Sequence, residues 1–114
     1  MPTVHVSLDT SVNPPVVTCN PEHLPVDHGS APINWLPAAR QNFTFASLSG
    51  LPSSIFTTPI VTDGEITTTD SNQNNGPEIA YPYQVCVSYG GHTYCTPPLK
   101  RPTGGNGYPT INNK

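Results

Sequence analysis

The chain has 114 residues, near the commonest size of a protein domain, and we expect a single domain over residues 1–114. Hydrophobic residues make up 34% and charged residues 10%, and this low charge separates the sequence from the usual disordered composition. The net charge is −3 with only four Lys or Arg residues, which argues against nucleic acid or an anionic membrane as a partner.

The beginning of the chain as given bears on its compartment. It starts with strand-like sequence rather than a basic segment followed by an apolar one, so no signal peptide is predicted in it. No run approaches the ~18 apolar residues of a membrane span. Scarce charge, abundant Thr, Asn and Pro, and a predicted disulfide favour an extracytoplasmic or secreted protein, and the compartment stays open.

Short apolar or β-branched runs, separated by Pro, Gly and Asn, predict strands along the whole chain. They cover residues 3–8, 16–19, 33–36, 43–45, 66–69, both halves of 81–96 and 108–112, with shorter extended pieces at Val26, 55–58 and 59–62. Trp35 is the largest candidate for the core. No stretch of ten residues has a helical period free of Pro and Gly. We therefore predict an all-β fold, an antiparallel β-sandwich of seven to nine short strands without a substantial helix.

The stretch 81–96 predicts a β-hairpin, because two Val-, Tyr- and Thr-rich runs flank Gly90 and Gly91. A turn at this pair sets Cys86 opposite Cys95 at a non-hydrogen-bonded position, where opposed residues lie closest. Their Cβ atoms are then near the separation that a disulfide needs, so the hairpin predicts a Cys86–Cys95 bond.

The same register divides the hairpin into two faces, since side chains alternate along a strand. The apolar face, expected to point inward, consists of Tyr83, Val85, Val87, Tyr89 and Tyr94. The other face is mostly polar and holds both cysteines, so we expect the disulfide on the outer surface.

Several segments resemble small bacterial immunoglobulin-like or cupredoxin-like proteins, many of which have no assigned activity. They are Cys-Asn-Pro-Glu-His-Leu-Pro-Val-Asp-His-Gly at 19–29, Ile-Asn-Trp at 33–35, Phe-Thr-Phe at 43–45, Tyr-Gln-Val-Cys-Val-Ser at 83–88 and Pro-Thr-Ile-Asn-Asn at 109–113. The resemblance implies a two-sheet Greek-key sandwich. It also offers a second pairing, because Cys19, Trp35 and Cys86 stand at spacings like those of the Cys–Trp–Cys pattern of immunoglobulin domains. Three cysteines leave at least one unpaired in a monomer, and Cys19 is then a small buried hydrophobe or, alternatively, a reactive thiol.

Metal binding is the main alternative function. A cupredoxin-type copper site needs two His, one Cys and usually a Met, and here Cys86 and His92 point to different faces of the hairpin. The segment with Glu22-His23 and Asp27-His28 could chelate zinc or another divalent ion with help from His5. Without a strand or helix to hold these side chains, we expect them to be solvent-facing loop residues.

No catalytic motif is present: there is no Gly-x-Ser-x-Gly, no His-Glu-x-x-His and no Walker loop. We therefore expect a non-enzymatic binding or structural module without a cofactor, the alternative being a copper- or zinc-binding cupredoxin-like protein. The loops expected at 20–30, 70–78 and 97–107 are polar and solvated, and such loops suit contact with a protein or carbohydrate. Tyr81, Tyr89 and Tyr108 are candidate contact residues, and the chain is expected to be a monomer or a weak homodimer.

Overall fold

The structure, a computed structural model, describes residues 2–96 and 109–114. Over these residues it contains eleven strands and no helix, which confirms the all-β prediction. The strands are β1 (Thr3–Asp9), β2 (Val16–Asn20), β3 (His23–Val26), β4 (Ala31–Pro37), β5 (Thr44–Ser49), β6 (Ile60–Val61), β7 (Ile66–Asp70), β8 (Ile79–Pro82), β9 (Gln84–Tyr89), β10 (His92–Cys95) and β11 (Thr110–Asn113). In the described part of the chain, nothing helical is long and apolar enough to cross a membrane.

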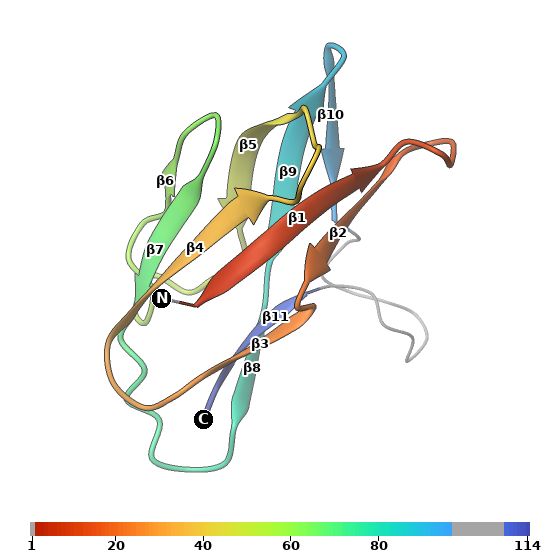
Figure 1. Ribbon diagram of the computed structural model, residues 1–114. Helices are drawn as coiled ribbons and strands as arrows, with labels where there is room; N and C mark the ends of the chain where they lie inside the picture. The colour runs from red at the N-terminus through yellow and green to blue at the C-terminus, as the bar shows by residue number, and fades with distance from the viewer. Residues whose placement is uncertain (1, 97–108) are drawn as a thin grey trace.

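The strands form three sheets (Figure 1). The five-stranded sheet has the order β2-β1-β4-β7-β6, and the hairpin sheet has the order β10-β9-β5. A smaller end sheet, β3-β11-β8, lies below these two in Figure 1, where β8 leads almost in line into β9. The loop predicted at 97–107 and Tyr108 lie outside the described residues.

Two strand pairs are parallel, so the prediction of a wholly antiparallel fold is wrong. β1 runs parallel to β4, with Val4 opposite Trp35, and β3 runs parallel to β11, with Leu24 opposite Ile111. The first case arises because the chain does not turn directly from β2 into the next strand of the sheet. It passes through β3 in the end sheet and re-enters beside the start of β1, so β4 must run in the direction of β1.

Part of the segment predicted as the loop 20–30 is a strand. β3 is held by β11 at both of its ends, where Thr110 N–H donates to Glu22 O at 2.8 Å and Lys114 N–H donates to Val26 O at 3.0 Å. Pro25 fits this strand because β3 is at the edge of its sheet, where a residue without an N–H is tolerated. The partner of β3 lies at the other end of the sequence, and local sequence carries no signal of that pairing.

The extended pieces expected at 55–58 and 59–62 are reduced in the structure to shorter elements. Only Ile60 and Val61 form a strand, β6, and Ile55 lies in a turn. Phe56 makes an isolated bridge with Asp70, which brings the turn against the end of β7. The preceding turn residues, Ser54 and Ile55, form one wall of the site described below.

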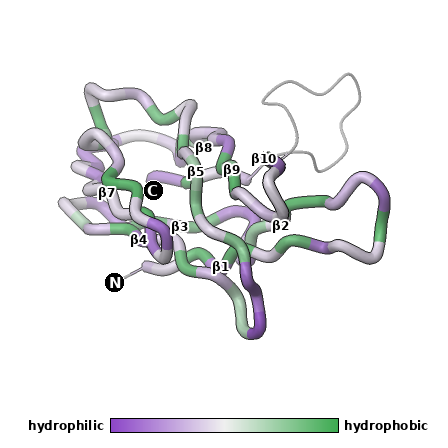
Figure 2. The backbone as a smooth tube through the Cα atoms, turned by 90° about the horizontal axis from the view of Figure 1, so that it is seen from above, coloured by the Kyte–Doolittle hydropathy of each residue, from purple (hydrophilic) through white to green (hydrophobic). Residues whose placement is uncertain are grey.

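The core lies where the inner faces of the strands meet, and Trp35 belongs to it as predicted. Trp35 is fully buried and packs edge-to-face on Tyr83, with ring centroids 5.4 Å apart. Phe43 and Phe45 are both buried and also pack edge-to-face. Hydrophobic and hydrophilic segments alternate along the chain in Figure 2, as expected where one face of each strand is covered. Burying each large side chain contributes roughly 1.5–3 kcal/mol.

The hairpin has the predicted register. Gly90 and Gly91 adopt positive φ angles of 60° and 83°, and Cys86 pairs with Cys95 and is joined to it by a disulfide. The inward orientation predicted for Tyr89 is wrong: it is exposed because it is the last residue of β9, next to the turn. The prediction of an outward disulfide holds for Cys95 only. Cys86 is buried because β9 is the central strand, with β5 and β10 on either side.

Candidate functional site

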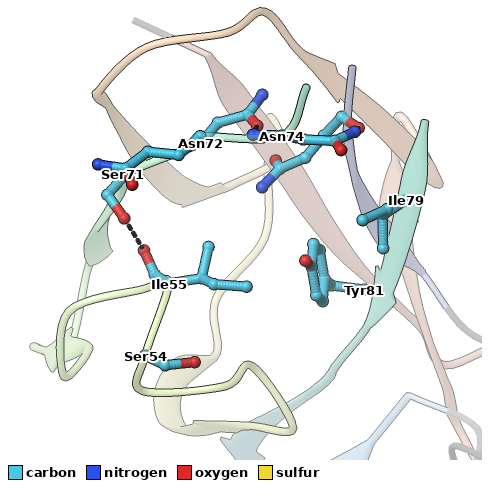
Figure 3. A pocket seen from close by; sticks show the side chains of 9 residues that line it. Ser54, Ile55, Ser71, Asn72, Asn74, Ile79 and Tyr81 are labelled. Atoms are coloured by element: carbon cyan, nitrogen blue, oxygen red, sulfur yellow. Dashed lines mark hydrogen bonds between the residues drawn. The ribbon is translucent and has the colours of Figure 1, made fainter. Parts of the chain in front are cut away.

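A hollow of about 240 Å³ lies between the end sheet and two segments that pack on it (Figure 3). Its walls come from the turn at 54–55, from residues 71–74, which follow β7, and from β8 and β11. The lining residues are Ser54, Ile55, Ser71, Asn72, Gln73, Asn74, Ile79, Tyr81 and Asn113. We call it the amide pocket, because four of these nine residues carry side-chain amides.

Asn72 fixes the segment 71–74 to the end sheet. Its side chain is fully buried, and Nδ2 lies 3.0 Å from Val26 O, 3.1 Å from Asp27 O and 3.3 Å from Lys114 O. Its Oδ1 accepts a hydrogen bond from the backbone N–H of Asn74 at 3.0 Å, an Asx turn of the kind asparagine favours. One side chain therefore connects the ends of β3 and β11 to the chain that leaves β7.

Asn74 and Ser71 complete the attachment. Asn74 Nδ2 donates to Pro77 O at 2.8 Å and to Asn113 O at 3.0 Å, and its Oδ1 accepts from Gly76 N–H at 3.1 Å. Ser71 donates to Ile55 O from both its N–H and its Oγ, each at 2.9 Å (Figure 3). The walls of the amide pocket are thus preorganised by hydrogen bonds, and the prediction of a fully solvated loop at 70–78 is wrong for its first residues.

The lower part of the amide pocket is apolar. Figure 3 shows the Tyr81 ring on one side of the hollow and the Ile55 side chain on the other, with the amides of Asn72 and Asn74 above them. Tyr81 is half-buried and packs edge-to-face on Phe56, with ring centroids 5.5 Å apart. The pocket thus has an aromatic and an aliphatic surface below a hydrogen-bonding rim.

None of the nine described residues that line the amide pocket carries a charge. The nearest acidic group in the same segment is Asp70, which is buried at the end of β7. Burial raises the pKa of its carboxyl group above the ordinary value of 3.8, against smaller lowering effects from the Asn113 side chain and the Asn72 backbone N–H. The environment of the pocket is therefore polar and neutral.

The residues considered for a divalent ion are not brought together. Glu22 Oε2 lies 3.3 Å from His23 Nε2, and the other ring nitrogen of His23 lies 2.7 Å from Thr110 Oγ1. Asp27 and His28 follow the far end of β3, and His5 is on β1 in another sheet. Within residues 2–96 and 109–114, no three His, Cys, Asp or Glu side chains are grouped so that they could hold a metal ion.

The residues considered for copper or for nucleophilic chemistry are also separated. Cys86 is in the disulfide, and the ring of His92 stacks at an angle on Tyr94 with centroids 6.3 Å apart. Cys19 is the free cysteine of the described residues, and burial raises the pKa of its thiol to about 12. A thiol with so high a pKa is almost wholly protonated at neutral pH, so Cys19 is a packing residue and not an activated nucleophile.

Of the three tyrosines proposed as contact residues, Tyr81 lies in the amide pocket. Tyr89 borders a second, smaller hollow of about 150 Å³ next to Arg40 and Asn42. Sequence reasoning missed Asn72, because a run of Asp, Ser, Asn and Gln is typical of a solvated loop, and it missed Asn113 at the other end of the chain. The one usable signal for Asn72 is that residues 70–75 include several asparagines and only one charged residue, since asparagines bind backbone groups locally.

Comparison of the chain with protein-family models, with curated proteins and with solved structures finds no match.

Proposed function

We propose that the chain is a non-enzymatic binding module and that its amide pocket takes a small, neutral ligand rich in hydroxyl groups, such as one sugar ring. The observation that carries this proposal is the combination of a half-buried tyrosine ring with an uncharged rim, on which the Gln73 amide and the Ser54 hydroxyl are exposed.

The size of the amide pocket favours a single ring. Pockets that hold drug-sized ligands measure roughly 300–1,000 Å³, and this one has about 240 Å³. It has the usual composition of a small-molecule site, an apolar surface with a few polar groups that fix the orientation. A sugar ring has matching surfaces, with C–H groups for Tyr81 and hydroxyl groups for the rim.

The available polar groups favour a neutral partner. Gln73 and Ser54 are exposed at the rim, and a glutamine amide both donates and accepts hydrogen bonds, as hydroxyl groups do. A charged ligand would lose hydration here without meeting an opposite charge, which costs more than the transfer of a hydroxyl group.

The lack of a charge also underlies the non-enzymatic part of the proposal. The nine described lining residues include no carboxyl, imidazole, thiol or amine group, so no base of these kinds lines the pocket to activate the hydroxyl groups of Ser54 and Ser71 as nucleophiles.

We further propose that the fold is a β-sandwich related to the immunoglobulin-like or cupredoxin-like group. The packing of Trp35 from β4 on Tyr83, which directly precedes β9, supports this, because it joins the five-stranded sheet to the hairpin sheet across one core. In this sandwich the amide pocket lies at one end, where binding residues are commonly found.

The proposal is tested by calorimetric titration with the methyl glycosides of glucose, galactose, mannose and N-acetylglucosamine. At least one glycoside is expected to bind, and Tyr81→Ala is expected to weaken its binding about tenfold, the value of one aromatic contact. Gln73→Ala should also weaken binding, and it changes an exposed side chain, so the fold should be preserved.

Tyr89→Ala is the matched control, because it removes an exposed tyrosine from a part of the surface that does not line the amide pocket. It should leave the affinity unchanged. The proposal is wrong if no glycoside of the panel binds, or if Tyr89→Ala weakens binding and Tyr81→Ala does not.

A further inference from the structure

Asp70 and Asn113 join the five-stranded sheet to the end sheet. Asp70 is the last residue of β7, and Asn113 is the last residue of β11. Asn113 Nδ2 donates to Asp70 Oδ1 at 3.1 Å, and both side chains are buried. Asn113 also forms part of the wall of the amide pocket. The pair is therefore a structural connection next to the proposed site.

One oxygen on each of these side chains has no hydrogen-bond partner. Asp70 Oδ2 and Asn113 Oδ1 are both inaccessible to bulk solvent and to a ligand in the pocket. An ionised carboxylate and an amide oxygen are both acceptors only and cannot satisfy each other. Leaving a buried acceptor unsatisfied destabilises the folded state, and two such atoms on one bonded pair need an explanation.

A single proton supplies that explanation. When it is on Asp70 Oδ2, this oxygen becomes a donor, and the free acceptor on the residue already bonded to Asp70 is Asn113 Oδ1. The two planar groups then share two hydrogen bonds, one in each direction. We propose that Asp70 is a neutral acid in the folded protein and forms this acid–amide pair with Asn113, so that the attachment of the end sheet depends on pH.

The groups packed around Asp70 carry no charge. They are Ala31 opposite it on β4, Phe56 in the bridge from the turn, Asn72 along the chain and Asn113 on β11. Two charged side chains border this junction, Lys114 directly after β11 and Asp27 directly after β3, and both are exposed, with Nζ and Oδ1 4.0 Å apart. Desolvation is the largest influence on the pKa of Asp70 and raises it, in agreement with the proposal.

The sign of the pH effect follows from linkage. The pKa of Asp70 is higher in the folded than in the unfolded protein. The stabilisation of the folded state by the protonated acid is therefore fully present below the unfolded pKa of 3.8 and is lost as the pH rises through the folded pKa. As the pH rises from the unfolded to the folded pKa of Asp70, the unfolding equilibrium constant increases by about tenfold for each unit by which folding raises that pKa. This inference rests on the pair itself and does not depend on the proposed ligand.

The direct test is a carbon-13 NMR titration of the carboxyl groups of the wild-type protein, which has four aspartates. Asp70 is expected to titrate above its ordinary value and above Asp9, whose pKa is lowered by hydrogen bonds from Ser11. Titration of Asp70 at or below its ordinary value would overturn the proposal. This test needs no variant to fold.

Urea unfolding across the same pH range provides the second test. Asp70→Asn keeps the shape of the side chain and places an N–H donor at the position of the acid proton. As the pH rises from about 4, the free energy of unfolding of this variant should therefore decrease less than that of wild type. Asp27→Asn is the control, because Asp27 is exposed, and its profile should follow that of wild type. The same pH profile for Asp70→Asn and wild type would also overturn the proposal.

Discussion

The hairpin β9–β10 and the end sheet β3-β11-β8 are specified in different ways. In the hairpin, each residue pairs with one a few positions away, and two glycines between the strands set the register. In the end sheet, β3 pairs with a strand whose residues are 87 positions later, as for His23 and Thr110. The comparison shows that a turn carries local information about pairing, whereas the end sheet depends on contacts that form only in the folded chain.

The two regions also differ in what stabilises them. The hairpin has a covalent bond between its strands, while the end sheet is held by buried amides, above all that of Asn72. If this contrast is correct, removal of one buried amide from the end sheet should lower the free energy of unfolding more than removal of the disulfide from the hairpin does.

The largest effect is expected for Asn72→Ala. The substitution leaves the carbonyl oxygens of Val26, Asp27 and Lys114 without this donor, and it should lower the free energy of unfolding by about 3 kcal/mol. Urea denaturation measures this loss. Hydrogen exchange should show that the backbone amides of β3 and β11 lose protection before those of β9.

Gln73→Ala is the matched control, since it removes the neighbouring exposed amide. Its effect on stability should be within about 0.5 kcal/mol. Equal losses for the two variants would show that Asn72 does not have the role described for it.

A smaller effect is expected when the disulfide is removed by the double substitution of Cys86 and Cys95 to serine. The cysteines are nine positions apart, and a loop of this length corresponds to about 2.5 kcal/mol in the chain-entropy description. The register should survive, because the glycine turn remains. Urea denaturation gives the loss, and cross-strand nuclear Overhauser effects between Val87 and Tyr94 report the register.

The smallest effect is expected for Gly91→Ala. A Cβ atom at this position meets nothing within 4 Å, so the cost arises only from the φ angle of 83° and should be about 1 kcal/mol. Gly64→Ala is the control, because Gly64 is equally open and has no left-handed backbone conformation. A loss for Gly64→Ala as large as that for Gly91→Ala would contradict the conformational explanation.

Much of the fold could be predicted from local patterns. The alternation of Val4, Val6 and Leu8 identified β1, and the single Trp identified a fully buried core residue. The parallel pairing could not be predicted, and of β3 only an extended piece at Val26 could, because Leu24 and Val26 pair with a strand near the other end of the chain.

The candidate site could be predicted only in part. Tyr81 was named as a contact residue, since a tyrosine beside a polar loop suits binding, and it lies in the amide pocket. Asn72 and Asn113 escaped notice because nothing in their local sequence distinguishes a buried asparagine from a solvated one. Their partners are backbone and side-chain groups distant in sequence, such as Val26 O and Asp70 Oδ1.

The central claim, that the amide pocket holds the ligand, is tested most directly by nuclear Overhauser effects between a bound methyl glycoside and the tyrosine rings of the wild-type protein. Contacts are predicted between the C–H protons of the sugar and the ring protons of Tyr81. Contacts to Tyr89 without any to Tyr81, with a glycoside that binds, would contradict the account.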